Sequence, residues 1–429
     1  MKVLMFGWEF PPHISGGLGT ACYGLTKGMT SFSDMEILFV IPKAFGDEDR
    51  SSIGLIGANN VLIKARDIRI SGFLKKIQQI EVGVNLLPYV DPELYEKCST
   101  QTFQGENKFI TNDFEGKLNF KGGYGQNLMH EISNYALVAA AIAAEQSFNV
   151  IHAHDWLCYP AGIAAKYMSG KPLVIHVHAT DFDRSGGNVN PVVYNIEKQG
   201  MDAADRIITV SNLTRSIVIE KYGIAPEKVV TVYNAVEPME NAGWTKMPMR
   251  GSLDDKIVTF LGRITMQKGP EYFIEAASLV LKKMKNVRFV MAGSGDMMNK
   301  MIRRAARLGI CDKFSFTGFL KGDDVYRMFR LSDVYVMPSV SEPFGISPLE
   351  AMQSNVPVII SRQSGVAEIL KHAIKIDFWD THAMADAIYG ILNYPALHSI
   401  FSKQGKSEVD NLKWETSARH VREVYYSVI

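Results

Sequence analysis

Two glutamates, Glu342 and Glu350, bracket the stretch of this chain whose residue types could do the most chemistry. They stand eight positions apart in the segment SEPFGISPLE, 341–350, after an apolar run at 334–338 that is typical of a buried strand. A carboxylate just beyond the carboxyl end of a parallel strand lies where open α/β sheets bind ligands. A helix that begins near Ser347 would add free N–H groups and a positive dipole end, which suit a phosphate. The segment therefore predicts a site that grips a phosphorylated, hydroxyl-rich ligand from two sides.

The second glutamate also has a purely structural interpretation. Ser347, Pro348 and Glu350 have the spacing of a capping box, with Ser at the N-cap, Pro at the first helical position and Glu reaching back to a backbone amide. The sequence leaves both roles open for Glu350, whereas Glu342 is harder to explain without a ligand.

Two cations follow the first predicted strand of the second half of the chain. Arg263 and Lys268 are five positions apart in a turn, beside Gly262 and Gly269. Arg provides a planar fork of donors and Lys a point charge, and this combination suits a diphosphate. The alternative is an ordinary solvated basic turn, but the position at the end of a predicted strand favours the phosphate site.

Four of the ten histidines end two predicted strands of the first half: His152 and His154, followed by Asp155, and then His176 and His178. Two histidines one residue apart on a strand point to the same face of a sheet. A metal site is one interpretation of this pattern. We prefer satisfied core histidines for His152 and His176 and cleft residues for His154, Asp155 and His178, and we expect no metal.

A glycine-rich turn at 15–20 follows the first predicted strand and opens a helix. Gly16 and Gly17 would let backbone amides approach a ligand closely, although a tight strand-to-helix turn uses the same residues. The turn does not match the dinucleotide-binding fingerprint, and the sequence contains no GxxxxGK[ST] phosphate loop.

Strand-like apolar runs alternate with helical patterns in both halves of the chain, which predicts parallel sheets covered by helices. The predicted strands are 2–7, 36–42, 150–154, 173–178 and 206–210 in the first half, and 257–262, 287–293, 314–318, 334–338 and 356–361 in the second. Helices are predicted at 271–284, 297–308 and 323–331. The sequence thus predicts an α/β fold of two doubly wound, Rossmann-like domains that face each other across a cleft.

The predicted domains are 1–240, with a less regular insertion at 46–120, and 250–410. A linker candidate at 237–244 separates them. An amphipathic helix at 413–429 is expected to cross back to the first domain.

Composition argues against several classes of protein. With 429 residues, 47% hydrophobic and 21% charged, the chain is an ordinary globular protein with enough residues for two or three domains. A net charge of +1 gives no support to nucleic-acid binding, and four cysteines without CxxC spacing indicate a reducing compartment. The longest apolar stretch, 135–144, is too short to span a bilayer, so we expect a cytoplasmic protein. The segment 73–77 is a faint candidate for membrane contact, and an ordinary surface segment is the preferred interpretation.

Together these segments resemble retaining glycosyltransferases of the GT-B fold, in the glycogen and starch synthase and GT4 group. The resemblance covers nearly the whole chain, and its most specific part is the pair Glu342 and Glu350, which is similar to the family's E-x7-E motif. The other segments that carry it are the glycine loop 16–19, HAHDW at 152–156, His178, Val210–Ser211, Tyr233–Asn234, 262–269 and AGSG at 292–295.

The resemblance implies a role for each of these residues. Arg263 and Lys268 would bind the diphosphate of the donor and neutralise the leaving group. Glu342 would hold hydroxyls of the donor sugar, Glu350 those of the ribose, and His178 would contact the sugar near the reacting carbon. The further donor-binding residues implied are Gly16, Gly17, Asp155, Asn234, Gly293, Phe319, Leu320, Phe344, Gly345, Ile346 and Ser347. The expected partners are a nucleotide-sugar and a carbohydrate acceptor, with no cofactor.

The implied activity is that of a hexosyltransferase that moves an α-glucosyl unit from UDP- or ADP-glucose to a glucan such as glycogen. Bacterial-type glycogen synthases carry a lysine where this chain has Ile14, so the resemblance does not choose between the two nucleotides. One alternative is a GT4 enzyme of surface polysaccharide or lipid-linked sugar synthesis. Another is a nucleotide-sugar epimerase on a similar two-domain fold.

Overall fold

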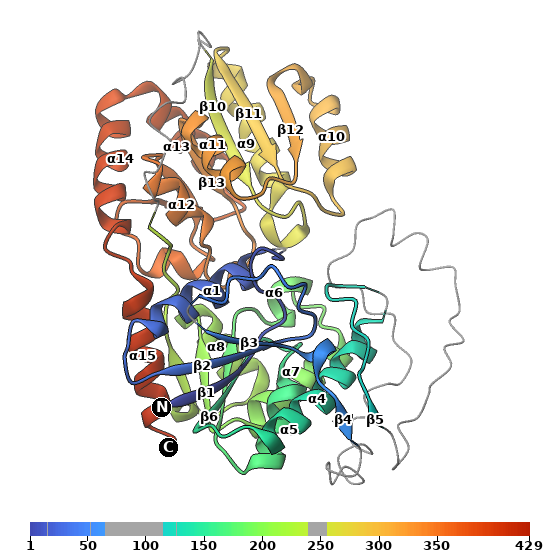
Figure 1. Cartoon of the computed structure of the whole chain (residues 1–429). Coiled ribbons are helices and arrows are strands. Elements are labelled where there is room, and N and C mark those ends of the chain that lie inside the picture. The colour runs from blue at the N-terminus through green and yellow to red at the C-terminus, as the bar shows by residue number, and fades with distance from the viewer. Residues whose placement is uncertain (15, 52, 65–114, 126, 239–254) are drawn as a thin grey trace. The chain divides into compact units, whose positions relative to one another are not determined.

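The computed structural model of the chain describes residues 1–14, 16–51, 53–64, 115–125, 127–238 and 255–429. The chain divides into two compact units (Figure 1). The first unit contains 1–182, 187–234 and 414–429, and the second contains 183–186 and 235–413. Most of the predicted insertion and linker lies outside the described residues, as does the segment 73–77.

A seven-stranded parallel sheet forms the centre of the first unit. In spatial order its strands are β3 (Gly54–Gly57), β2 (Glu36–Ile41), β1 (Lys2–Phe6), β6 (Val150–His154), β7 (Leu173–Val177), β8 (Arg206–Thr209) and β9 (Val229–Thr231). A separate antiparallel pair joins β4 (Ile63–Lys64) and β5 (Glu115–Gly116). The strand order reverses between β1 and β6, and open α/β sheets bind ligands beyond the carboxyl ends of the strands at such a reversal.

A six-stranded parallel sheet forms the centre of the second unit. In spatial order its strands are β12 (Phe314–Gly318), β11 (Val287–Ala292), β10 (Lys256–Leu261), β13 (Val334–Met337), β14 (Val358–Ser361) and β15 (Ile374–Ile376). Here the order reverses between β10 and β13. The basic turn follows β10 and Glu342 follows β13, so both lie where this rule places a ligand.

The α-helices follow the strands in a regular alternation. In the first unit they are α1 (Gly17–Thr30), α4 (Leu128–Glu145), α5 (Tyr159–Ser169), α7 (Pro191–Ala203), α8 (Asn212–Tyr222) and α15 (Trp414–Tyr426). In the second they are α9 (Pro270–Lys283), α10 (Met298–Arg307), α11 (Asp323–Leu331), α12 (Ser347–Gln353), α13 (Thr381–Asn393) and α14 (Pro395–Val409), while the short α6 (Asp181–Ser185) falls at a division between the units.

Every strand predicted from an apolar run is present, and its ends lie within two residues of the prediction. The predictions missed β3, β9 and β15, which are edge strands of three or four residues. An edge strand this short gives too few apolar positions to stand out from a loop. The α/β fold with two parallel sheets is confirmed.

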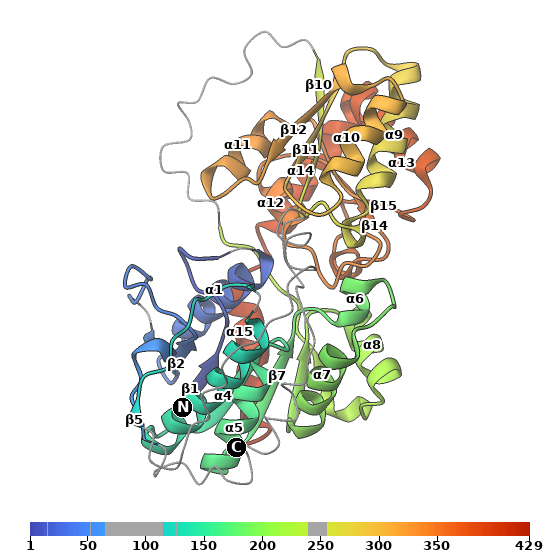
Figure 2. The same ribbon diagram turned by 90° about the vertical axis from the view of Figure 1, so that its right-hand side faces the viewer.

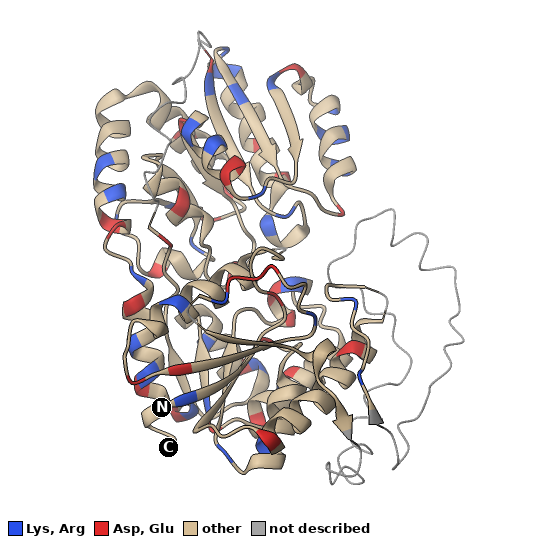
Figure 3. Cartoon of the chain, in the orientation of Figure 1, with Lys and Arg blue, Asp and Glu red and all other residues tan. Residues whose placement is uncertain are grey.

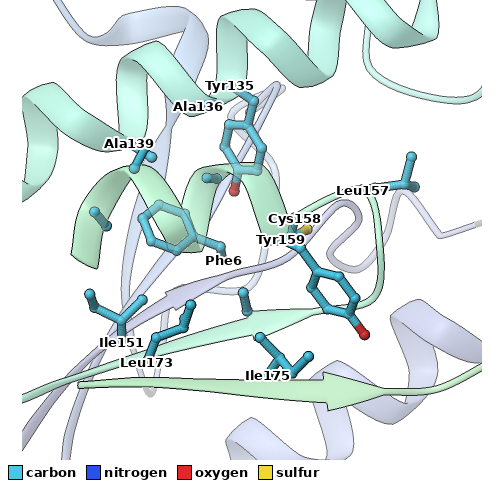
Figure 4. Close-up of a cluster of buried hydrophobic side chains, with 14 of the residues drawn as sticks. Phe6, Tyr135, Ala136, Ala139, Ile151, Leu157, Cys158, Tyr159, Leu173 and Ile175 are labelled. Carbon is cyan, nitrogen blue, oxygen red and sulfur yellow. The ribbon is translucent and has the colours of Figure 1, made fainter. Parts of the chain in front are cut away.

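The apolar stretch 135–144 belongs to α4, which packs against α5 over one face of the first sheet (Figures 2 and 4). The small side chains of Ala136 and Ala139 let the helices approach closely above Phe6 and Ile151 (Figure 4). Tyr135 donates from its hydroxyl to the carbonyl oxygens of Gly7 and Val40, at 3.0 and 2.6 Å, so its one polar atom is satisfied in the core. Among the described residues, no helix has the length and apolar character needed to cross a membrane.

Charge is distributed without segregation in either unit. Lys and Arg residues alternate with Asp and Glu residues over the ribbon of each one (Figure 3). This mixture of signs agrees with the net charge of +1.

The opposite face of the first sheet carries α1 and the C-terminal helix α15, which pack on each other. Their contact is close because α1 presents glycines to Trp414. A Cβ atom on Gly28 would meet the carbonyl oxygen of Trp414 at 2.6 Å, and one on Gly24 would meet its indole ring at 2.3 Å. Ser417 also donates to the carbonyl oxygen of Tyr233 at 2.6 Å, which fixes α15 to the segment after β9.

This packing predicts that Gly28→Ala destabilises the first unit. The added methyl group meets backbone, which cannot rotate away, so the free energy of unfolding should fall by about 1–3 kcal/mol. The matched control is Gly390→Ala in α13, where the nearest atom to a new Cβ belongs to Leu397 at 3.6 Å. That variant should be neutral or gain about 0.5–1 kcal/mol from helix propensity. Urea unfolding compares the two, and equal losses would contradict the proposed close contact.

Candidate functional site

The predicted site residues fall into two groups, one in each unit, and each group is described separately. The first unit holds Gly16, Gly17, Asp155, His178 and Asn234. The second holds Gly293, Arg263, Lys268, Phe319, Leu320, Glu342, Phe344, Gly345, Ile346, Ser347 and Glu350.

An ion pair between Lys268 Nζ and Glu342 Oε2 is the centre of the second group. Lys268 ends the short 3-10 helix Met266–Lys268 that follows β10, and Glu342 follows β13, so the pair joins the two strands at the reversal point. Both side chains are largely withdrawn from solvent, with exposed fractions of 21% and 8%. A carboxylate in this environment needs a cationic partner, because an unpaired buried charge is strongly unfavourable.

Gly269 makes this pairing sterically feasible. Its φ angle of 65° is left-handed, and a Cβ atom would lie 2.1 Å from the carbonyl oxygen of Pro338 at the end of β13. Any other residue would push the turn after β10 away from the end of β13. The glycine is thus the local reason why Lys268 reaches Glu342.

The backbone around Glu342 is also held from the neighbouring strand. Its N–H donates to the carbonyl oxygen of Gln363 and its carbonyl oxygen accepts from Gly365, both at 2.9 Å, in the loop that follows β14. Ser339 donates its hydroxyl to the Glu342 carboxylate at 3.1 Å. Within the part of the chain that the structure describes, all side-chain contacts of Glu342 use Oε2, so Oε1 is left to accept from a ligand.

Arg263 belongs to the same turn. Its guanidinium donates to the side-chain oxygen of Gln267 at 3.1 Å, and Gln267 donates to the carbonyl oxygen of Ser341 at 3.1 Å. The sequence interpretation missed Gln267 and Ser339, which link the cations to the Glu342 loop. The position of Gln267 between Arg263 and Lys268 was the signal that could have identified it.

Gly293 brings the end of β11 against the end of β10. A Cβ atom on this residue would lie 1.8 Å from the carbonyl oxygen of Gly262, and its N–H donates to the carbonyl oxygen of Gly318 at 2.8 Å. Three strand ends therefore meet through glycines, in agreement with a close backbone approach at this edge.

The capping-box interpretation of Glu350 is wrong. Helix α12 has Ile346 at its N-cap and no side-chain cap, and the Ser347 hydroxyl bonds instead to the Tyr335 hydroxyl at 2.8 Å. Glu350 is half-buried, and within the described chain its carboxyl group makes no hydrogen bond to a backbone amide. Burial raises the pKa of Glu350 to about 7.

The remaining predicted residues of the second unit surround these groups in the chain. Phe344 is buried, and its carbonyl oxygen accepts from Val366 at 2.8 Å, while Gly345 has a left-handed φ of 100°. Phe319 is 51% exposed just after β12, with the ammonium group of Lys321 over its ring at 5.6 Å. Leu320 packs beside a small apolar cluster of Ile257, Val290, Ala292 and Met328.

In the first unit, Asp155 and His178 come together at the ends of β6 and β7. Asp155 is buried with a left-handed φ of 60°, which is rare for a residue with a side chain. Its Oδ1 accepts from the N–H groups of His178 and Ala179, each at 3.3 Å. The His178 ring bonds through Nε2 to Nδ1 of His154 at 2.9 Å, and burial lowers the pKa of His178 to about 3.

The expectation that His152 and His176 are satisfied core residues is half right. Both are buried, and His152 Nδ1 bonds to the Tyr425 hydroxyl. Neither ring nitrogen of His176 has a hydrogen-bond partner, and Nε2 of His152 and of His154 lack one as well, among the residues that the structure describes.

The glycine turn after β1 leaves room above its backbone. An ideal Cβ atom on Gly16 or Gly17 would have no neighbour within 4 Å, whereas one on Gly19 would meet Ile14 at 2.4 Å. Internal packing therefore requires glycine at Gly19 and does not explain it at Gly16 and Gly17. Asn234 is buried at the end of the segment 187–234. Within the described part of the chain, its side chain makes no hydrogen bond to another predicted site residue.

Comparison with known proteins agrees with this arrangement. A family model described as Glycosyltransferase Family 4 matches residues 121–240, and one described as Glycosyl transferases group 1 matches 247–408. An uncharacterized glycosyltransferase of Methanocaldococcus jannaschii is 28% identical over 99% of this chain and 98% of its own. A glycogen synthase of Mycobacterium tuberculosis is 22% identical over 99% of this chain and 94% of its own. The Anabaena protein HepE, solved in complex with UDP and glucose, has the same fold, with a TM-score of 0.67 at 15% identity over the full length of both chains.

The environment of Glu350 predicts a pH-dependent stability. Because its folded pKa is about 7, the folded protein retains a proton that the unfolded chain, with a glutamate pKa of about 4.3, has already lost. Wild-type stability therefore falls as the pH rises between these values. Glu350→Gln removes the effect, so the variant should gain roughly 1–2 kcal/mol relative to wild type between about pH 5.5 and pH 8. Urea unfolding at the two pH values measures this gain. The exposed Glu415→Gln serves as the control, and a gain at Glu350 that does not change with pH would contradict the burial of this carboxyl group.

Proposed function

Because the chain is a glycosyltransferase of the GT4 type with the GT-B fold, we propose that it transfers an α-glucosyl unit from a nucleotide-glucose to an α-glucan such as glycogen. Two observations support this choice of substrates. The chain matches a protein named glycogen synthase over 99% of its length, and HepE, which shares the fold, was solved with UDP and glucose. The main support for a donor-binding site is the Lys268–Glu342 ion pair, which lies where the strand order of the second sheet reverses.

In the proposed donor site, different side chains bind the diphosphate, the sugar and the ribose of the donor. Lys268 and Arg263 take the diphosphate, because a point charge and a planar fork together match its oxygens. Glu342 accepts hydroxyls of the donor sugar through Oε1. Glu350 accepts the ribose hydroxyls, since its carboxylate has no other partner in the described structure and lies in the first turn of α12.

In the proposed reaction the bond between the anomeric carbon and the diphosphate oxygen breaks, and an acceptor hydroxyl oxygen forms the new bond on the same face. The acceptor proton passes to an oxygen of the departing diphosphate. Negative charge grows on the leaving group during this step, so fixed cations at Lys268 and Arg263 stabilise the transition state more than the ground state. The His178 ring at the end of β7 is neutral, because burial lowers its pKa to about 3.

A second candidate acceptor follows from the first loop. The chain has Ile14 where bacterial-type glycogen synthases carry a lysine, which favours a GT4 enzyme of surface polysaccharide or lipid-linked sugar synthesis. The reaction at the donor is the same in both cases.

Labelled UDP-glucose and ADP-glucose, each incubated with the protein and glycogen, test the proposed substrates. We expect label in glycogen from one of the two donors and release of the nucleoside diphosphate only when glycogen is present. Transfer from either donor to a lipid or small-sugar acceptor, with none to glycogen, would establish the second candidate instead.

The ion pair predicts different responses of stability and activity. Lys268→Ala leaves the charge of Glu342 without its partner and should lower the free energy of unfolding by about 1–3 kcal/mol and kcat/KM by about 100- to 1000-fold. Adding Glu342→Gln removes the unpaired charge, so the double variant should regain most of the stability and none of the activity. The control Lys283→Ala removes an exposed lysine of α9 and should change neither quantity. Recovery of transfer in the double variant would exclude both residues from the donor site.

A further inference from the structure

Four histidine rings form a continuous stack on one face of the first sheet. His152 and His154 come from β6, His176 from β7 and His178 from the residue after it, so alternate positions of adjacent parallel strands place them together. Ring centroids lie 4.2 Å apart for His152 and His154, 4.3 Å for His176 and His178, and 5.4 Å for His154 and His176. The stack lies on the side of the sheet that carries α15, where Tyr425 contacts His152.

The ring geometry favours packed imidazoles over a shared metal ion, although Cys22, His154 and His178 also offer ligand atoms within 4.8 Å of one another. Neighbouring rings are inclined by 10–39°, so they lie nearly face to face, whereas imidazoles that share an ion turn their nitrogens toward one centre. The possible ligand atoms of His152, His154 and His176 lie within 4.8 Å of one another. A tetrahedral zinc site with bonds of about 2.0–2.1 Å brings its nitrogens to about 3.3 Å.

The stack consists of neutral imidazoles. Burial lowers the pKa of His152 and His178 to about 3 and holds those of His154 and His176 well below the usual value, and the neighbouring rings lower three of the four further. A neutral imidazole carries one N–H, so one ring nitrogen donates and the other accepts. The hydrogen bond between His154 Nδ1 and His178 Nε2, at 2.9 Å, therefore has one donor and one acceptor.

The surroundings of His154 decide which ring donates. Its Nε2 is fully buried with no partner in the described structure, and a buried N–H without an acceptor is rarer than a buried acceptor without a donor. The proton of His154 is therefore on Nδ1, from which it donates to His178 Nε2. At the other end of the stack, His152 Nδ1 bonds to the Tyr425 hydroxyl, and either atom can supply the proton of this bond.

We propose that His154 is a positioning residue that holds His178 as the Nδ1–H tautomer, so that His178 presents an N–H donor to a ligand oxygen at the carboxyl end of β7. The proposal rests on the proposed function only in assigning that ligand to His178. His178 is the one ring of the stack that is not fully buried, and its Nδ1 makes no hydrogen bond to the described residues. An N–H group can stabilise negative charge that grows on an oxygen, and a bare nitrogen would repel it.

The unpartnered nitrogens support a functional origin of the stack. A buried polar atom without a partner is unfavourable, and the stack contains four such atoms, two of them on His176. Phenylalanine would keep the ring contacts without this cost. A stack kept only for packing would therefore be more stable without its histidines.

Nitrogen-15 NMR of the full-length, histidine-labelled protein tests the tautomer directly. We expect the His178 signals, assigned by their loss in His178→Gln, to show a protonated Nδ1 and a bare Nε2. The opposite tautomer would overturn the proposal. This result does not depend on activity, so it stands even if the wild-type protein transfers no glucose, which would overturn the proposed function alone.

Three variants then test the consequence for transfer. His154→Phe keeps the stack and removes the hydrogen bond, so kcat should fall about 10- to 100-fold with the donor KM nearly unchanged and the stability equal or higher. His154→Asn places an amide near the Nδ1 position and should recover most of kcat. The control His420→Phe changes an exposed histidine of α15 outside the stack and should leave kcat within about twofold. Wild-type kcat in His154→Phe, or no recovery in His154→Asn when both proteins are folded, would overturn the positioning role.

Discussion

The nearly buried charge of Glu342 is the constraint on which the second unit's site depends. A carboxylate that is withdrawn from water needs a cation beside it, and here Lys268 supplies it from the turn after a different strand, β10. Gly269 permits the close approach of that strand, since any side chain there would collide with Pro338. The pair is also suited to a change of partners, because a diphosphate can take over Lys268 while sugar hydroxyls satisfy Glu342.

The second unit buries a charged pair, whereas the polar rings at the strand ends of the first unit are uncharged. Burial lowers the pKa of all four histidines, so their rings are neutral, and the Asp155 carboxylate accepts from the backbone N–H groups of His178 and Ala179. Glycosyl transfer, as proposed, places positive charge on the sugar and negative charge on the diphosphate. A neutral histidine avoids repelling a positive charge of this kind.

Much of this could be predicted from sequence because it follows from periodicity and strand order. Two-sided apolar runs identified the central strands, and polar residues just after those runs identified Lys268, Glu342 and His178. The edge strands β3, β9 and β15 were missed because three or four residues carry no readable period. The capping box failed for a tertiary reason, since Tyr335 takes the Ser347 hydroxyl that a cap would need. A local sequence pattern cannot show that Tyr335 competes for the Ser347 hydroxyl, because the two residues belong to different elements.

The histidines are a second case in which a local sequence pattern does not predict the tertiary hydrogen-bond partners. Spacing predicted that His152 and His154 share a face, with His152 in the core and His154 at the cleft, whereas the structure buries both rings. The spacing contained nothing about which nitrogens would find partners. For His152 that outcome depends on Tyr425, which lies far from it in the chain. The C-terminal helix thus contacts one end of the stack, at His152, through Tyr425. The other end of the stack is His178, which follows β7. Gly24 and Gly28 set how closely α15 approaches α1. These two glycines therefore help to position Tyr425, and through it the stack that ends at His178.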